Sequence, residues 1–176
     1  ESGMKVIVSG TLGDHAIAVM GTRYGLDLPD TIQTDCAPLH AMCHKVLETF
    51  GKDIAFFRDP TRGGLATTLQ EIAQSAEKGI RLQEAAIPVR EEVQAVCQVL
   101  GYDPLYLANE GKMIAIVKDQ VAEDVVQLMR TFKEGRDAVI IGDVMKGNAG
   151  KVGLQTAVGG IRLLDMLGED QVPRIC

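Results

Sequence analysis

Two arginines and two glycines make residues 58–64 the most distinctive polar run of the chain, Arg58-Asp59-Pro60-Thr61-Arg62-Gly63-Gly64. The run follows an expected strand (54–57) and precedes an expected helix (65–76). Glycines let the backbone approach a ligand closely, a helix N-terminus attracts anions, and guanidinium groups bind phosphate through paired hydrogen bonds. The run therefore indicates an oxyanion site, with a purely structural turn as the alternative. It lacks the Lys-Ser/Thr ending of a Walker loop and the spacing of the Rossmann fingerprint.

A second polar run, Asn109-Glu110-Gly111-Lys112, lies directly before an expected strand, 113–117. A carboxylate that neighbouring amide and amine groups hold in place can act as a general base. Glu110 can equally be a turn residue that forms an exposed ion pair with Lys112. The sequence leaves both interpretations open.

The chain ends on a cysteine, Cys176, after a polar segment that begins at Gly168 and stiffens at Pro173. At about 3.3 Å per extended residue, this segment could carry the thiol over roughly 26 Å. The neighbouring Arg174 favours the thiolate, whereas the terminal carboxylate disfavours it. We expect residues 168–176 to be a flexible arm with an accessible thiol, the alternative being a frayed terminus that ends in cysteine by chance.

Another candidate anion site is the glycine turn Gly10–Gly13, between an expected strand (4–9) and an expected helix (16–23). Asp14 is placed to cap that helix. Free backbone N–H groups in such a turn can bind anions, but two glycines in a turn are also common for steric reasons.

Four metal-binding side chains fall along one face of an expected helix that Asp35 caps and that runs to about Phe50. They are Cys36, His40, Cys43 and His44. One helix rarely surrounds a tetrahedral zinc ion, and apolar residues lie between these four, namely Leu39, Met42, Val46 and Leu47. Packing against a core is therefore favoured, and no metal site is predicted. Cys97 is likewise expected on the apolar face of a helix, 88–100.

Composition restricts the classes of function. The chain has 176 residues, 46% of them hydrophobic, a net charge of −6 and four cysteines without a Cys-x-x-Cys pair. This length suits one domain, and the acidic balance argues against nucleic acid as a partner. No apolar run is long enough for a membrane span, so we expect a cytoplasmic protein without disulfides. Because a strand begins almost at once, at Met4, we also expect the chain to be the second half of a longer one.

Helices and strands alternate along the chain, and this alternation predicts an α/β fold. The remaining expected elements are strands at 79–83, 138–144, 152–156 and 160–164 and a helix at 119–132, with hairpin signals at 147–150 and 159–160. A mixed sheet with helices on its faces, a layered α/β/α sandwich, follows for residues 1–167.

Five separated motifs together resemble the HypE family of hydrogenase maturation proteins. They are Val8–His15, Arg58–Gly64, Ile87–Val89, Ala108–Lys112 and Pro173–Cys176. The resemblance implies the C-terminal domain of the aminoimidazole ribonucleotide synthetase superfamily, which includes selenophosphate synthetase. It covers only the C-terminal half of that family. The N-terminal half, which carries most ATP and Mg2+ ligands and the homodimer interface, is absent from the chain.

The same resemblance implies an ATP-dependent carbamoyl dehydratase. In that family HypF, a carbamoyltransferase, places a carbamoyl group on the terminal cysteine, here Cys176. HypE converts the resulting S-carboxamide into a thiocyanate, whose cyanide passes to iron held by HypC and HypD for the NiFe hydrogenase. Glu110 would be the base, and the nucleotide phosphate would meet a set of residues comprising Arg58, Asp59, Thr61, Arg62, Gly63, Gly64 and Asn109.

Two hypotheses about function therefore stand. In the first, the longer protein is this dehydratase, and the chain alone is inactive because its nucleotide-binding half is missing. In the second, the chain is a non-catalytic carrier and docking module that presents Cys176 to its partners.

Overall fold

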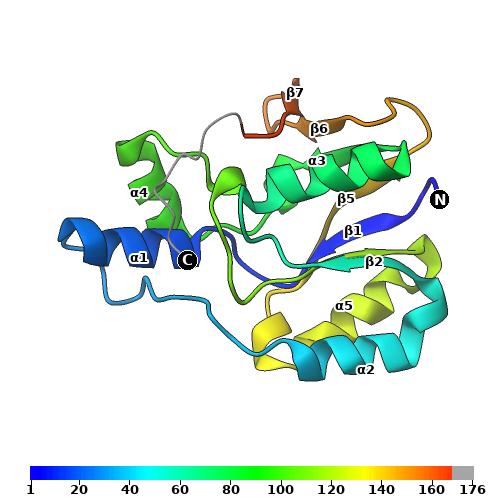
Figure 1. Cartoon of the computed structure of the whole chain (residues 1–176), viewed down its shortest axis with the longest axis horizontal. Coiled ribbons are helices and arrows are strands. Elements are labelled where there is room, and N and C mark those ends of the chain that lie inside the picture. The colour runs from blue at the N-terminus through cyan, green and yellow to red at the C-terminus, as the bar shows by residue number, and fades with distance from the viewer. Residues whose placement is uncertain (168–176) are drawn as a thin grey trace.

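A single sheet of seven strands organises the computed structural model of the chain, which describes residues 1–167 (Figure 1). The strands are β1 (Lys5–Val8), β2 (Ile54–Arg58), β3 (Gly79–Gln83), β4 (Ile114–Val117), β5 (Val139–Met145), β6 (Val152–Gln155) and β7 (Ile161–Leu164). Their order is β2-β4-β1-β5-β3-β6-β7. β3 and β6 pair in parallel and the other neighbours pair antiparallel, so the sheet is mixed.

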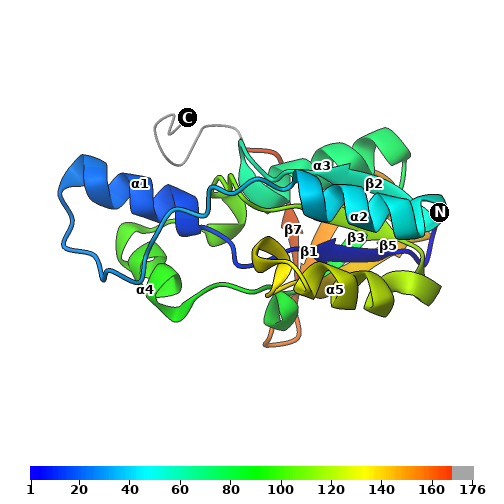
Figure 2. The same cartoon turned by 90° about the horizontal axis from the view of Figure 1, so that it is seen from below.

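Helices cover both faces of the sheet. They are α1 (Asp14–Tyr24), α2 (His40–Phe50), α3 (Gly64–Ala76), α4 (Glu91–Leu100) and α5 (Ala122–Arg130). α3 lies on one face, while α2 and α5 lie together on the other, and α1 packs on α4 beyond one end of the sheet (Figures 1 and 2). This arrangement confirms the predicted α/β/α sandwich.

The interior strand β1 is buried on both faces, which explains its continuous apolar sequence. Val6 and Val8 are fully buried in the core that α3 closes, whereas Ile7 is fully buried in the core that α2 and α5 close. Successive side chains of a strand point to opposite faces, so a strand covered on both faces needs a continuous apolar run rather than alternation. β4 repeats the pattern, with Ile114 and Ile116 on the first face and Ala115 and Val117 on the second.

Two predictions about the elements of the fold are wrong, one helix start and one hairpin. The helix expected from Asp35 begins instead at His40, and Pro38 explains the delay, because a proline disfavours helical backbone at the residue before it. The signal at 147–150 also makes no hairpin. β5 pairs with β1 and β3, and the chain then crosses β3 to set β6 parallel to it. The signal at 159–160 is confirmed, since β6 and β7 pair antiparallel.

Among the described residues, no helix is long and apolar enough to cross a membrane. The predicted arm at 168–176, with Cys176, lies outside the described residues.

Candidate active site

Strand pairing brings three distant loops to one edge of the sheet. Val8, the last residue of β1, lies opposite Ile114, the first of β4, and opposite Val139, the first of β5. The loop after β1 and the loops before β4 and β5 therefore meet there. Ser9 extends the pairing beyond β1, because its backbone N–H donates to the Met113 carbonyl at 2.9 Å.

A pocket of about 320 Å³ lies at this edge. Its lining comes from those three loops, from the loop before α2 and from Arg90 before α4. The lining charged residues are Asp14, Asp35, Glu134 and Asp137 on the acidic side and Arg90, Lys112, Lys133 and Arg136 on the basic side. Four charges of each sign make a charge-balanced pocket rather than a general trap for anions.

Asn109 fastens three of the site's segments to one another. This side chain is fully buried, and its Oδ1 accepts a 2.8 Å hydrogen bond from the Gly13 backbone N–H. Its Nδ2 donates to the carbonyls of Pro60 at 3.2 Å and Leu107 at 2.8 Å. Both donors of the amide are thus used inside the protein. Asn109 holds the 58–64 run beside Glu110, and its predicted part in nucleotide binding stays a prediction.

Asp14 is a buried anchor rather than a helix cap. It is the first residue of α1, its side chain is 2% exposed, and it makes no capping hydrogen bond. Its Oδ2 accepts a short hydrogen bond from the Thr11 hydroxyl and lies 4.0 Å from Lys112 Nζ. Its Oδ1 lies 3.4 Å from Arg90 Nε. The carboxylate therefore stands between two cations at the pocket wall.

Asp35 lies in the loop before α2, and its side chain is also 2% exposed. Oδ2 is 3.2 Å from Lys112 Nζ, and Oδ1 accepts a 3.1 Å hydrogen bond from the Glu110 backbone N–H. Oδ1 also lies 3.9 Å from His15 Nδ1. The predicted role of Asp35 as a helix cap is wrong, and the residue instead connects parts of the site.

His15 and Cys36 meet at the same wall. His15 Nδ1 is 2.9 Å from the Thr34 hydroxyl and 3.5 Å from Cys36 Sγ. His15 is buried, whereas Cys36 is exposed. The expectation that Cys36 packs on an apolar helix face is therefore wrong, because Pro38 leaves it in a loop.

Glu110 presents a buried carboxylate oxygen, Oε1, that has no hydrogen-bond partner among the described residues. Lys112 directs its ion pairs to Asp35 and Asp14 instead. The exposed Glu110–Lys112 pair considered from the sequence is thus not formed. A carboxylate without an internal partner is free to accept a proton, and the role of Glu110 as a base stays a prediction.

Three further buried atoms of the site have no hydrogen bond among the described residues, namely Asp14 Oδ1, Asp35 Oδ2 and His15 Nε2. The two aspartate oxygens are nevertheless beside cations, Arg90 and Lys112. An ionised carboxylate can only accept hydrogen bonds. Glu110 Oε1 is therefore suited to a ligand group that donates hydrogen bonds or protons, such as an amide nitrogen.

The 58–64 run is built as a glycine-dependent turn into α3. Gly63 and Gly64 have φ of +71° and +62°, and a Cβ on Gly64 would lie 2.5 Å from the Leu107 carbonyl oxygen. Arg58 ends β2 and pairs with Glu71 of α3 at 2.5 Å, whereas Arg62 is exposed at the start of that helix. The glycines are thus needed by the fold itself, which supports the structural alternative without excluding a phosphate contact.

Two more predicted residues, Asp59 and Thr61, complete the run. Asp59 is exposed, Thr61 is half-buried, and the Thr61 carbonyl accepts from the Gly64 backbone N–H at 3.0 Å. Their parts in phosphate binding, like that of Arg62, stay predictions.

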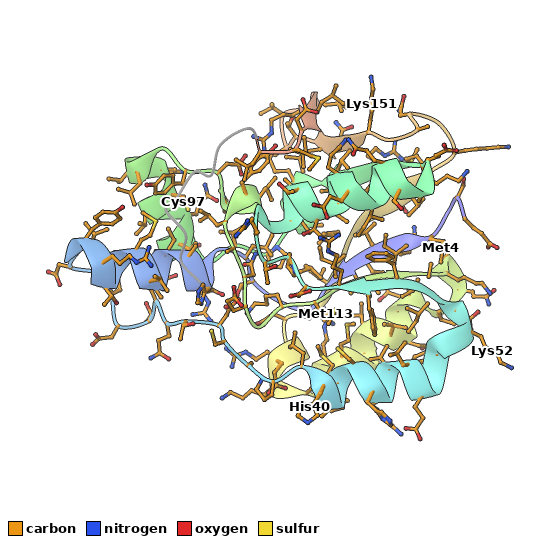
Figure 3. All side chains as sticks on the ribbon, viewed as in Figure 1. Met4, His40, Lys52, Cys97, Met113 and Lys151 are labelled. Atoms are coloured by element: carbon orange, nitrogen blue, oxygen red, sulfur yellow. The ribbon has the colours of Figure 1, made fainter. Side chains whose placement is uncertain are left out.

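The two other described cysteines are less exposed than Cys36. Burial raises the pKa of Cys43, and burial together with the nearby Asp103 raises the pKa of Cys97 to about 11. Figure 3 shows Cys97 on α4 and His40 at the start of α2. Within residues 1–167 no group of three or more His, Cys, Asp or Glu side chains could hold a metal ion.

Sequence comparison agrees with the fold. Residues 1–155 match the family described as AIR synthase related protein, C-terminal domain, and the chain belongs to that family. The particular relatives are HypE proteins. The chain is 46% identical to the "Carbamoyl dehydratase HypE" of Bradyrhizobium diazoefficiens, over 99% of the chain and 50% of that protein.

Solved structures give the same relatives. The structure of HypE in complex with ATP superposes with a TM-score of 0.94 at 42% identity, covering 100% of this chain and 53% of the other. The HypE–HypF complex gives 0.89 at 39% identity, covering 95% and 54%. The chain thus spans about half the length of the proteins it matches.

Proposed function

We propose that the longer protein to which this chain belongs takes part in hydrogenase maturation by dehydrating an S-carboxamide on Cys176. The product is a thiocyanate, which supplies cyanide ligands for the active-site iron of a NiFe hydrogenase. The names of its relatives support a dehydratase, and the ATP complex of one relative supports ATP as the co-substrate. The observation that carries the proposal is the buried Oε1 of Glu110, which has no partner among the described residues and lies next to two residues of the pocket lining, Gly111 and Asp35.

The net reaction converts R–S–C(O)NH2 and ATP into R–S–C≡N, ADP, phosphate and a proton. An amide oxygen leaves poorly, and ATP supplies the phosphoryl group that allows it to depart as phosphate. Both nitrogen protons must be removed as the C≡N bond forms. Glu110 is the group that we assign to this proton removal, because its oxygen is not engaged by the protein.

The other residues bind and orient. Asn109 keeps the 58–64 run beside Glu110 through the Pro60 carbonyl. Arg62 and the Gly63 amide, at the start of α3, would meet a nucleotide or product phosphate, and Gly64, whose N–H donates to the Thr61 carbonyl, would let the backbone approach it. The same turn contains Arg58, Asp59 and Thr61, which we place near that phosphate. Asp14 and Asp35 would hold Arg90 and Lys112 in place at the pocket wall.

Magnesium does not fit the described part of this chain. Asp14 and Asp35 are already beside Lys112 and Arg90, and no cluster of three carboxylate, imidazole or thiolate groups suits an ion there. We therefore assign Mg2+ binding to the half of the longer protein that this chain lacks.

Partners follow from the same proposal. HypF is proposed as the carbamoyltransferase, since a relative forms a HypE–HypF complex. HypC and HypD would accept the cyanide, the longer protein would be a homodimer in the cytoplasm, and the chain alone would lack turnover.

The test uses the longer protein, incubated with ATP, HypF and its carbamoyl donor, with the mass of the Cys176 peptide measured over time. Loss of one water from the carbamoylated peptide supports the dehydratase. Glu110→Gln should slow that loss by about 10² to 10⁴ while ATP still binds. Carbamoylation that is never followed by loss of water would favour the carrier hypothesis. Thiocyanate formation at the wild-type rate in Glu110→Gln would remove Glu110 from the role of base.

A further inference from the structure

Asp35 contacts the Glu110 backbone, Lys112 and His15, and we infer that it is a positioning residue that fixes Glu110 and keeps Lys112 away from it. This inference rests on the proposed function for the role of Glu110. The contacts of Asp35 that carry it do not depend on the reaction.

The first contact joins the loop before α2 to the turn that carries Glu110. Asp35 Oδ1 accepts from the Glu110 backbone N–H at 3.1 Å. The two backbones also touch, because a Cβ on Gly111 would lie 1.7 Å from the Asp35 carbonyl oxygen. A displacement of Asp35 therefore displaces Glu110 as well.

The second contact controls Lys112. Its Nζ is 3.2 Å from Asp35 Oδ2 and 4.0 Å from Asp14 Oδ2, so Asp35 is the nearer counter-ion. The Lys112 side chain is only 11% exposed, and a buried ammonium that loses its partner turns to another carboxylate.

Glu110 is the carboxylate at risk, because both oxygens of Asp14 already have partners in Thr11 and Arg90. It lies two residues before Lys112, and its Oε1 has no partner among the described residues. If Lys112 paired with that oxygen, the lone pair needed to accept a proton would be occupied. Asp35 thus keeps the base available by holding the lysine.

Two substitutions separate these contacts. Asp35→Asn keeps an oxygen acceptor for the Glu110 N–H but removes the charge beside Lys112. Asp35→Ala removes both. Asp124→Asn, an exposed carboxylate on α5, is the matched control.

Amide hydrogen exchange of the 176-residue chain tests the first contact without any enzyme assay. Asp35→Ala should speed exchange of the Glu110 amide by about tenfold or more, because a charge-assisted hydrogen bond is lost. Asp35→Asn should stay close to wild type. Unchanged exchange in Asp35→Ala, in a protein that melts as wild type, would overturn the inference whether or not the protein is a dehydratase.

Turnover of the longer protein tests the second contact. Asp35→Asn should lower kcat by on the order of 10², with KM for ATP little changed, because Lys112 then pairs with Glu110 and occupies the oxygen that accepts the proton. In the Glu110→Gln background, Asp35→Asn should cause no further loss, since its effect acts through Glu110. If the two losses multiply, Asp35 acts on its own and the inference is wrong. A wild-type protein that makes no thiocyanate would refute the proposed function, and the exchange experiment would still decide the inference.

Discussion

Replacing Gly64 by alanine tests whether the 58–64 turn depends on its glycine for backbone reasons. The residue has φ of +62°, where an L-residue loses about 1 to 2 kcal/mol. A Cβ there would also lie 2.5 Å from the Leu107 carbonyl oxygen and 2.6 Å from that of Leu105. These neighbours are backbone atoms, which cannot rotate away as a side chain can.

The magnitude follows from both effects. Forcing extra atoms into packed surroundings costs about 1 to 3 kcal/mol, so Gly64→Ala should lower the free energy of unfolding by roughly 2 to 5 kcal/mol. Gly25→Ala is the matched control, because Gly25 has φ of +61° but a Cβ there would meet nothing within 4 Å. Gly25→Ala should lower the free energy of unfolding only by the cost of the backbone conformation, about 1 to 2 kcal/mol.

Urea denaturation of the two variants and the wild type, followed by circular dichroism, measures the difference. The reasoning is refuted if both variants unfold at the same urea concentration, since only the contact with residues 105–107 distinguishes them. A Gly64→Ala protein as stable as wild type would show, in addition, that the turn can adopt another backbone path.

Three further predictions concern side chains. In the longer protein, Arg62→Ala should weaken ATP binding, measured by calorimetry, by about 1.5 to 3 kcal/mol with little change in melting temperature. Arg81→Ala on β3, the control, should change neither the ATP affinity nor the melting temperature. If Arg62→Ala binds ATP as tightly as wild type, Arg62 is not part of the phosphate site. Iodoacetamide at neutral pH should modify Cys36 faster than Cys43 and Cys97, because burial raises the pKa of the latter two thiols. Peptide mass spectrometry measures the three rates, and the reverse order would contradict the exposed position of Cys36. Asn109→Ala should lower the free energy of unfolding by about 1 to 3 kcal/mol, because buried groups lose their partners, and urea denaturation showing no loss would mean that other groups or water replace its hydrogen bonds.

The fold was predictable where burial on both faces leaves a plain pattern in the sequence. The apolar runs of β1 and β4 and the glycine before α3 are local signals of this kind. The later start of α2 could also have been predicted from the sequence, since Pro38 lies inside the expected helix. The hairpin signal at 147–150 misled because local turn residues carry no information about which strand comes next in the sheet.

The site was predictable only in part. Glu110 and the 58–64 run stand out as motifs, and the structure links them through Asn109. Asp35, Arg90 and the loop at 133–137 were not recognised as parts of the site, because strand pairing and loop packing bring them together across more than a hundred residues. A buried aspartate next to a cysteine has no spacing that distinguishes it from a helix cap.

The place of β1 in the sheet also bears on how the chain folds. β1 is the first strand of this chain, yet the residues opposite Val8 are Ile114 and Val139. During synthesis its apolar side chains have no strand partner until most of the chain has emerged, and contacts of such long sequence separation slow folding. The pocket at the end of β1 should therefore be among the last parts to form. Until β4 and β5 have been synthesised, the apolar strand β1 stays exposed, and exposed apolar segments of this kind are bound by chaperones.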